Sequence, residues 1–125
     1  MHLDNRLTPV QIETQLKKSG QALMFKNDEL KELGVKKAEA EKSYRVELAK
    51  KQLELRANNF PATLINDLAR GDKLVAKLKF ERDVAVSMYE ACREKIKDLR
   101  EEIGIMRSLS ASQRAEYENT GSTGP

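Results

Sequence analysis

A regular stripe of hydrophobic residues marks the second half of the chain, from Asp72 to about Leu109. The segment contains no proline and one glycine, Gly104. Its apolar residues recur mostly at three- and four-residue steps, the spacing that lines one face of a helix. They are Leu74, Val75, Leu78, Ala85, Met88, Cys92, Ile96, Leu99, Ile103 and Met106. The pattern predicts one helix on the order of 55 Å long, and its stripe needs a second long helix as a partner.

A second helical pattern precedes this segment. Thr8-Pro9-Val10-Gln11 predicts a helix start, with the threonine as N-cap, the proline at the first helical position and the glutamine completing a capping box. The apolar residues that follow lie close to heptad spacing: Ile12, Leu16, Leu23, Leu30 and Leu33. Ser19-Gly20 and Gly34 weaken a helix. The sequence therefore leaves open whether residues 9–33 and 35–57 form one helix or two.

The stripe is less regular from Val35 to Arg56, where Val46 and Leu53 fall off-register from Ala38, Tyr44, Leu48 and Leu55. Asn58-Asn59-Phe60-Pro61 predicts a corner, because asparagine tolerates a left-handed helix end and proline disfavours a helix before it. A short helix over Ala62–Ala69 follows, with Leu64, Ile65 and Leu68 on one side, and Asp72 is a good N-cap for the long helix.

These elements predict an all-α fold of two long antiparallel helices joined by a corner with a short helix. We expect an elongated molecule with a single helical domain over residues 1–109. Residues 110–125 are expected to form a short turn and a flexible C-terminal tail. Large side chains are scarce in the 125 residues, so we expect the buried surface to be completed by homo-oligomerisation.

Charge and cysteine content narrow the partners only slightly. The formal net charge is +3, too small to establish nucleic-acid binding without a local patch. No apolar run is long enough for a signal-peptide core or a membrane span, so no membrane partner is expected. The single cysteine excludes an internal disulfide. The expected compartment is the cytoplasm, that of the host if the protein is phage-encoded.

Residues that could carry catalysis or bind a metal are not arranged in a recognisable pattern. His2 has no second histidine or cysteine near it with which to share a metal. The glutamates interleave with lysines and arginines at helical spacing, which is typical of a solvated helix face. We therefore expect no enzymatic activity, no metal and no cofactor.

The stripe of the long helix is the candidate oligomer interface. The residues assigned to it are Leu78, Ala85, Met88, Cys92, Ile96, Leu99, Ile103 and Met106. Cys92 lies between apolar neighbours and is expected to act as a small buried hydrophobe, with oxidation between subunits as the alternative.

Basic residues converge on the corner from both sides. The candidate nucleic-acid-binding residues are Lys50, Lys51, Arg56, Arg70, Lys73 and Lys77. They could neutralise several phosphates, or they could be a merely solvated face. We expect Phe60 to plug the corner, and Tyr44 and Tyr89 to pack with their hydroxyls at the rim.

The run from Leu48 to Arg107 resembles small helical phage proteins and, more distantly, the UvsY family of phage recombination mediators. The resemblance covers roughly the second half of the chain and lies in the order of elements. These are a basic helix, a polar corner, a short helix and a long helix that closes with Ile103-Gly104-Ile105-Met106-Arg107. Of the basic pair that the family places before the corner, Arg56 has a counterpart here and Glu54 occupies the other position.

The resemblance implies an oligomeric ring that binds single-stranded DNA and helps to load a recombinase in place of a single-strand-binding protein. Because Glu54 departs from the family pattern, Lys50 and Lys51 would have to supply the missing charge. The alternative hypothesis is a non-enzymatic assembly factor or small chaperone, whose apolar stripe receives a partner helix without nucleic acid.

Overall fold

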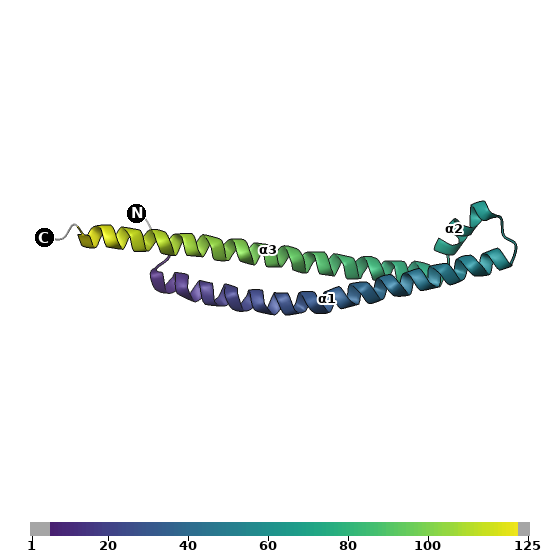
Figure 1. The fold of residues 1–125 in the computed structure, drawn as a ribbon, viewed down its shortest axis with the longest axis horizontal. Helices are drawn as coiled ribbons and strands as arrows, with labels where there is room; N and C mark the ends of the chain where they lie inside the picture. The colour runs from purple at the N-terminus through teal and green to yellow at the C-terminus, as the bar shows by residue number, and fades with distance from the viewer. Residues whose placement is uncertain (1–5, 123–125) are drawn as a thin grey trace, which may run out of the picture. The chain divides into compact units, whose positions relative to one another are not determined.

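The computed structural model describes residues 6–122, and all the regular elements in that range are helices. Helix α1 spans Pro9–Ala57, α2 spans Ala62–Arg70 and α3 spans Lys73–Ser122 (Figure 1). The predicted all-α class is confirmed, as is the order of long helix, corner with a short helix, and long helix. His2 and the last three residues of the predicted tail lie outside the described residues.

Local side-chain chemistry fixes the start of α1. The backbone N–H of Thr8 donates to Oε1 of Gln11 at 2.8 Å, and the backbone N–H of Gln11 donates to Oγ1 of Thr8 at 3.1 Å. This reciprocal pair satisfies two donors that the first turn of a helix otherwise leaves without partners. The capping box predicted from the sequence is confirmed.

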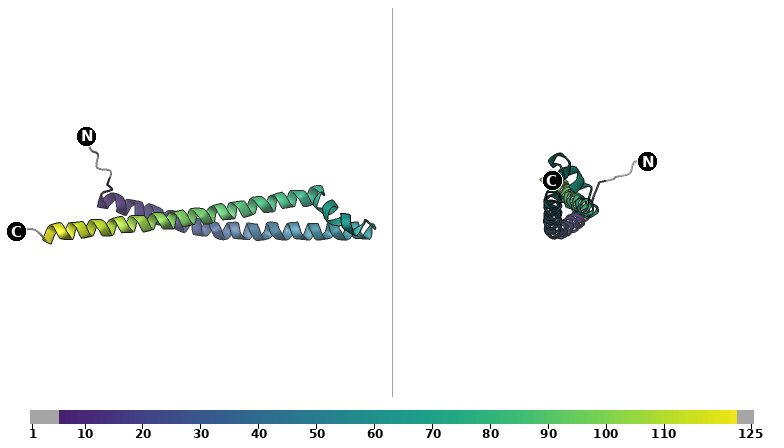
Figure 2. Two further views of the ribbon diagram at one scale, coloured as in Figure 1. Left: turned by 90° about the horizontal axis from the view of Figure 1, so that it is seen from above. Right: turned by 90° about the vertical axis from the view of Figure 1, so that its right-hand side faces the viewer.

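The corner is also built from the predicted residues. Asn59 adopts a left-handed conformation, with φ of 62°, which ends α1. Asp72 caps α3, because its Oδ2 accepts hydrogen bonds from the backbone N–H groups of Leu74 at 3.1 Å and Val75 at 3.2 Å. Helix α2 lies against the last turns of α1 (Figure 2), where Ile65 and Ala69 form a buried cluster with Leu55.

The chain divides into two compact units, where the sequence predicted one domain over residues 1–109. We call residues 29–93 the corner unit, and residues 1–28 with 94–125 the terminal unit. In the terminal unit Gln113 donates to the carbonyl of Leu7, and Gln15 donates to Glu102. In the corner unit Lys51 pairs with Asp72 and Arg82 pairs with Glu41. In each unit lower-numbered residues of the first segment meet higher-numbered residues of α3, so the segments run antiparallel.

The two glycine-containing sites of α1 do not break the helix, which is continuous over 49 residues. Ser19 is buried and its Oγ accepts a hydrogen bond from Nε2 of Gln15 at 3.1 Å. A Cβ at Gly34 would lie 3.5 Å from Cε2 of Tyr89, so this glycine lies against the edge of an aromatic ring of α3. A Cβ at Gly20 would meet no atom within 4 Å.

The predicted end of the long helix near Leu109 is wrong, because α3 continues to Ser122. Ser110 and Gln113 are half-buried and continue the seven-residue spacing of Ile103 and Met106. Gln113 donates a hydrogen bond to the carbonyl of Leu7, and the side chain of Arg6 lies 3.9 Å from that of Glu116. Polar residues thus occupy the packed positions beyond Leu109, and a hydrophobic pattern cannot reveal them.

The spacing of packed residues differs between the two long helices. In the corner unit Leu33, Tyr44 and Leu55 of α1 are buried at eleven-residue intervals, a period that favours straight or right-handed packing. The packed positions of α3 follow a seven-residue period in both units, from Leu78 and Ala85 to Leu99 and Met106, and this period favours left-handed packing. The eleven-residue period explains the irregular stripe noted between residues 35 and 56, since the off-register Val46 and Leu53 are exposed.

We predict that Gly104→Ala raises the free energy of unfolding by about 1 kcal/mol, because alanine costs less than glycine in a helix interior. No atom lies within 4 Å of the Cβ position at Gly104. Gly71→Ala is the control. Because Gly71 is the C-cap of α2 and lies outside a helix interior, alanine there should not bring the same increase in the free energy of unfolding. Urea denaturation followed by circular dichroism measures both, and a less stable Gly104→Ala variant would contradict the continuous α3.

Candidate nucleic-acid interface

The six basic residues predicted to bind nucleic acid all belong to the corner unit. Lys50, Lys51 and Arg56 lie in the last two turns of α1, Arg70 ends α2, and Lys73 and Lys77 lie in the first two turns of α3. Residues 50–77 contain six basic and three acidic side chains. Their net charge of +3 equals that of the whole chain, so the remaining residues are balanced.

Two of these six side chains are paired with neighbouring carboxylates. Nζ of Lys50 lies 3.4 Å from Oε1 of Glu47. Nζ of Lys51 lies 3.5 Å from Glu54 and 3.7 Å from Oδ1 of Asp72, and this lysine side chain is only 27% exposed. Lys51 therefore links the end of α1 to the start of α3, and its charge is largely occupied by these two carboxylates.

The other four residues keep their charge available. Arg56, Arg70, Lys73 and Lys77 are exposed. Within residues 6–122, no carboxylate of the structure lies in ion-pair distance of them. Lys51 pairs with two of the three acidic residues among residues 50–77. Little negative charge therefore remains to offset these four cations. We call Arg56, Arg70, Lys73 and Lys77 the corner cations.

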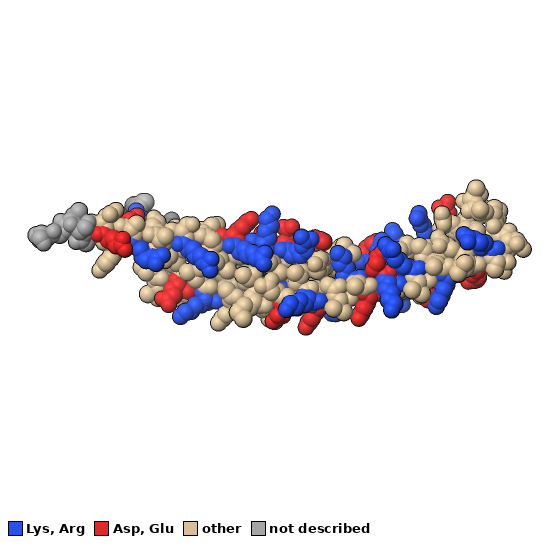
Figure 3. Space-filling view, in the orientation of Figure 1, with Lys and Arg blue, Asp and Glu red and all other residues tan. Residues whose placement is uncertain are grey.

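Basic and acidic side chains alternate over most of the face drawn in Figure 3. The corner differs from the rest of the chain in its charge balance, since residues 50–77 carry a net charge of +3 and the other residues are balanced. Within the corner the cations without an ion-pair partner are the better placed, because a paired lysine must give up its partner before it can contact a phosphate.

Exposed apolar residues surround the corner cations. Phe60 is 44% exposed, so the prediction that it plugs the corner is wrong. The short helix buries Ile65 and Ala69, whereas Leu64 and Leu68 are largely exposed, which corrects the predicted face of this helix. A groove of about 590 Å³ lies nearby and is lined by Val46, Leu74, Leu78, Glu39, Lys42, Ser43 and Glu47.

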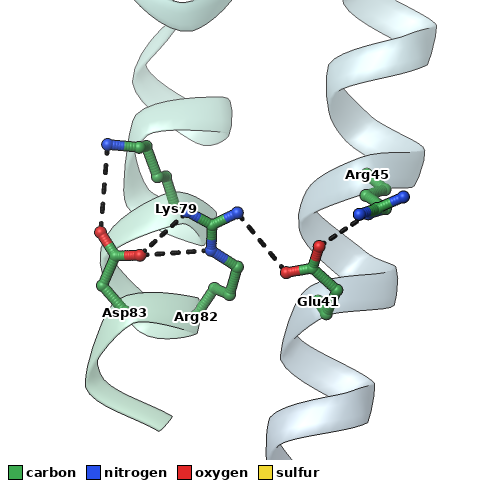
Figure 4. A network of polar contacts seen from close by, with 5 residues as sticks. All are labelled: Glu41, Arg45, Lys79, Arg82 and Asp83. Carbon is green, nitrogen blue, oxygen red and sulfur yellow. Dashed lines mark hydrogen bonds and ion pairs between the residues drawn. The ribbon is translucent and has the colours of Figure 1, made fainter. Parts of the chain in front are cut away.

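A polar network centred on Arg82 joins α1 to α3 in the corner unit (Figure 4). Nη1 of Arg82 lies 3.5 Å from Glu41, and Nη2 lies 3.0 Å from Asp83. The guanidinium also covers the ring of Tyr44, 4.7 Å from its centroid, a favourable cation–π contact. Nε of Arg45 lies 2.6 Å from Glu41, and Lys79 lies 4.0 Å from Asp83.

This network shifts two ionisation equilibria. The hydrogen bond from Arg45, aided by the charge of Arg82, lowers the pKa of Glu41 from the usual 4.5, and desolvation opposes the shift. The hydrogen bond to Asp83 raises the pKa of Arg82. Because the pKa of Glu41 is lowered, its contribution to stability is present above pH 4.5 and is lost as the pH falls through its pKa in the folded protein. These charges serve the fold rather than a ligand.

The predicted oligomer-interface residues occupy three kinds of environment. Cys92, Ile96 and Leu99 are buried in the single chain, whereas Met88 is 52% exposed. The remaining four are half-buried: Leu78, Ala85, Ile103 and Met106. Much of the stripe is therefore covered by the chain's own packing, and burial of the Cys92 thiol favours its expected role as a core residue over oxidation between subunits.

Sequence reasoning overlooked Arg82 and Phe80. Arg82 lies seven residues after the buried Val75, and this spacing could have placed it on the packed side of α3. Phe80 falls outside the stripe, and it is 68% exposed on α3. Tyr44 and Tyr89 each contact a cation that the hydrophobic pattern does not indicate. Arg82 covers the ring of Tyr44, and Nζ of Lys37 lies 4.5 Å from the ring centroid of Tyr89.

Within the part of the chain that the structure describes, no group of three or more histidine, cysteine, aspartate or glutamate residues could hold a metal ion. None of the described helices combines the length and the apolar character needed to cross a membrane. No protein-family model, curated protein or solved structure matches the chain.

We predict that Arg82→Ala lowers the free energy of unfolding by about 1–2 kcal/mol, because it removes a partly buried ion pair and a cation–π contact together. Arg93→Ala is the control, since Arg93 is 57% exposed and its ion-pair partner among the described residues is Glu90; its loss should cost less than about 0.5 kcal/mol. Equal effects of the two substitutions in urea denaturation would contradict a structural role for the Arg82 network.

Proposed function

We propose that this chain is a non-enzymatic accessory protein that binds single-stranded DNA as a homo-oligomer and assists the loading of a recombinase. The observation that supports DNA binding is the excess of positive charge at the corner, where the corner cations have no carboxylate within ion-pair distance among residues 6–122. Phosphate groups are the complementary ligand, since each bound phosphate releases counterions from the nucleic acid.

The modest charge of one chain makes oligomerisation part of the proposal. Four cations on a single corner supply few phosphate contacts, but corners repeated in an assembly can contact one strand together. The second and later contacts are then effectively intramolecular, which raises the overall affinity without any new type of contact. Exposed apolar residues such as Met88, Ile105 and Leu109 offer surface that such an assembly could bury.

The recombination role rests on the resemblance of residues 48–107 to phage recombination mediators. A recombinase or a single-strand-binding protein is the expected protein partner on that basis. The charge pattern itself supports only the binding of a polyanion. Single strands are favoured over duplex because apolar and aromatic side chains lie beside the cations, and unstacked bases can contact them.

A second candidate function, binding of a partner helix, is favoured by the groove lined by Val46, Leu74 and Leu78. An amphipathic helix could place apolar side chains there. The two functions respond differently to salt: binding to DNA weakens steeply as salt rises, whereas contacts of an apolar groove are largely retained.

We predict that Arg56→Ala combined with Lys73→Ala weakens binding to an oligothymidine and flattens its salt dependence. Two lost phosphate contacts should reduce the slope of log affinity against log salt by about 1.4. Helicity and oligomer size should not change, because both side chains are exposed and lack ion-pair partners among residues 6–122. Fluorescence anisotropy at several salt concentrations measures the affinity.

The matched control for this double variant is Lys18→Ala combined with Lys97→Ala, which removes the same charge from exposed positions of the terminal unit. It should bind almost as the parent does. Equal losses of affinity in the two double variants would show that binding depends on overall charge and not on the corner. A parent protein that does not bind the oligothymidine at low salt would refute the proposal.

We predict that light scattering gives a mass of several chains at micromolar concentration. The physical reason is that large apolar side chains stay exposed in the single chain, including Met88, Ile105 and Leu109. A monomeric mass that does not change with concentration would refute the oligomer and, with it, the gain in affinity expected from repeated corners.

A further inference from the structure

Phe80 is an exposed aromatic residue on the same face of α3 as two of the corner cations. It follows Lys73 by seven residues and Lys77 by three, spacings that bring side chains to one face of a helix. Along the helix axis, the backbone of Phe80 lies about 4.5 Å beyond that of Lys77 and about 10 Å beyond that of Lys73. The ring is 68% exposed, and Val84, one turn further on, is 41% exposed.

The charges around this face favour an anionic ligand. Neither Lys73 nor Lys77 has a carboxylate within ion-pair distance in the described part of the chain. The carboxylate of Asp83 is neutralised, because it lies 3.0 Å from Nη2 of Arg82 and 4.0 Å from Nζ of Lys79. Glu81 projects about 100° away from Phe80 around the helix; it lies one turn after Lys77, but not within ion-pair distance of it. An approaching phosphate therefore meets two available lysines beside the ring.

The two tyrosines of the corner unit cannot serve in the same way. Tyr44 is buried, and Arg82 covers its ring. Tyr89 is half-buried, with Lys37 over its ring and Gly34 against its edge. Phe60 is less exposed than Phe80. Among the described aromatic residues of the corner unit, Phe80 presents the most open ring.

We infer that Phe80 is a base-stacking position for single-stranded nucleic acid, with Lys73 and Lys77, which both precede it on this face, contacting phosphates of the adjoining strand. The inference rests on the proposed function and adds to it a residue that contacts the bases. Stacking on an aromatic ring requires no particular base, so this position contributes affinity without sequence preference.

The test compares Phe80→Leu with Phe25→Leu in binding to a fluorescein-labelled oligothymidine. Both phenylalanine rings are 68% exposed, but Phe25 lies in the terminal unit. Phe80→Leu should weaken binding by about tenfold, as expected for the loss of one stacked base. The salt slope should stay at the parent value, because no phosphate contact is removed. Phe25→Leu should bind as the parent does.

A second readout observes stacking directly. The chain contains no tryptophan, so Phe80→Trp introduces a single indole reporter, and Phe25→Trp introduces another in the terminal unit. Stacking of a base on the indole should quench the emission of Phe80→Trp as oligothymidine is added. The emission of Phe25→Trp should stay constant.

The outcomes separate the inference from the proposed function. If the parent binds with the expected salt dependence but Phe80→Leu binds equally well and Phe80→Trp is not quenched, the stacking role is refuted and the proposed function stands. If Phe80→Leu reduces the oligomer mass, the face is a contact between copies of the chain, which also refutes the stacking role. A parent that does not bind at low salt refutes the proposed function and this inference together.

Discussion

The arrangement of the corner depends on the carboxylate of Asp72, which contacts two helices at once. One oxygen accepts hydrogen bonds from the first backbone N–H groups of α3, at 3.1 and 3.2 Å. The other lies 3.7 Å from Nζ of Lys51 in α1. The residue that defines the start of α3 therefore also links it to the end of α1. Since Lys51 also pairs with Glu54, two acidic residues of the corner are neutralised together, and the four corner cations keep their charge.

Two different packing periods support this corner. The eleven-residue spacing of Leu33, Tyr44 and Leu55 belongs to α1 in the corner unit. The packed positions of α3 keep a seven-residue spacing in both units. The Arg82 network adds a polar link within the corner unit, next to the buried ring of Tyr44. The charge feature that sets the corner apart is the net charge of +3 carried by residues 50–77.

Much of the fold could be predicted from the sequence, because caps and turns are local. Thr8, Asn59 and Asp72 behave as their side-chain chemistry dictates. The extension of α3 beyond Leu109 could not be predicted, since Ser110 and Gln113 are polar and pack through contacts with a distant segment. Of the six predicted basic residues, sequence spacing could not reveal that Lys51 is held by two carboxylates. The position of Phe80 beside Lys77 was visible in the sequence, but its exposure required the structure.

The central claim is that single-stranded DNA contacts the corner through its uncompensated cations. Amide chemical shifts recorded while a short oligothymidine is added would test it directly at each residue. The account predicts changes concentrated between Arg56 and Phe80, decreasing as salt is raised, with little change in the terminal unit. Changes confined to the terminal unit, or no changes at low salt, would contradict it.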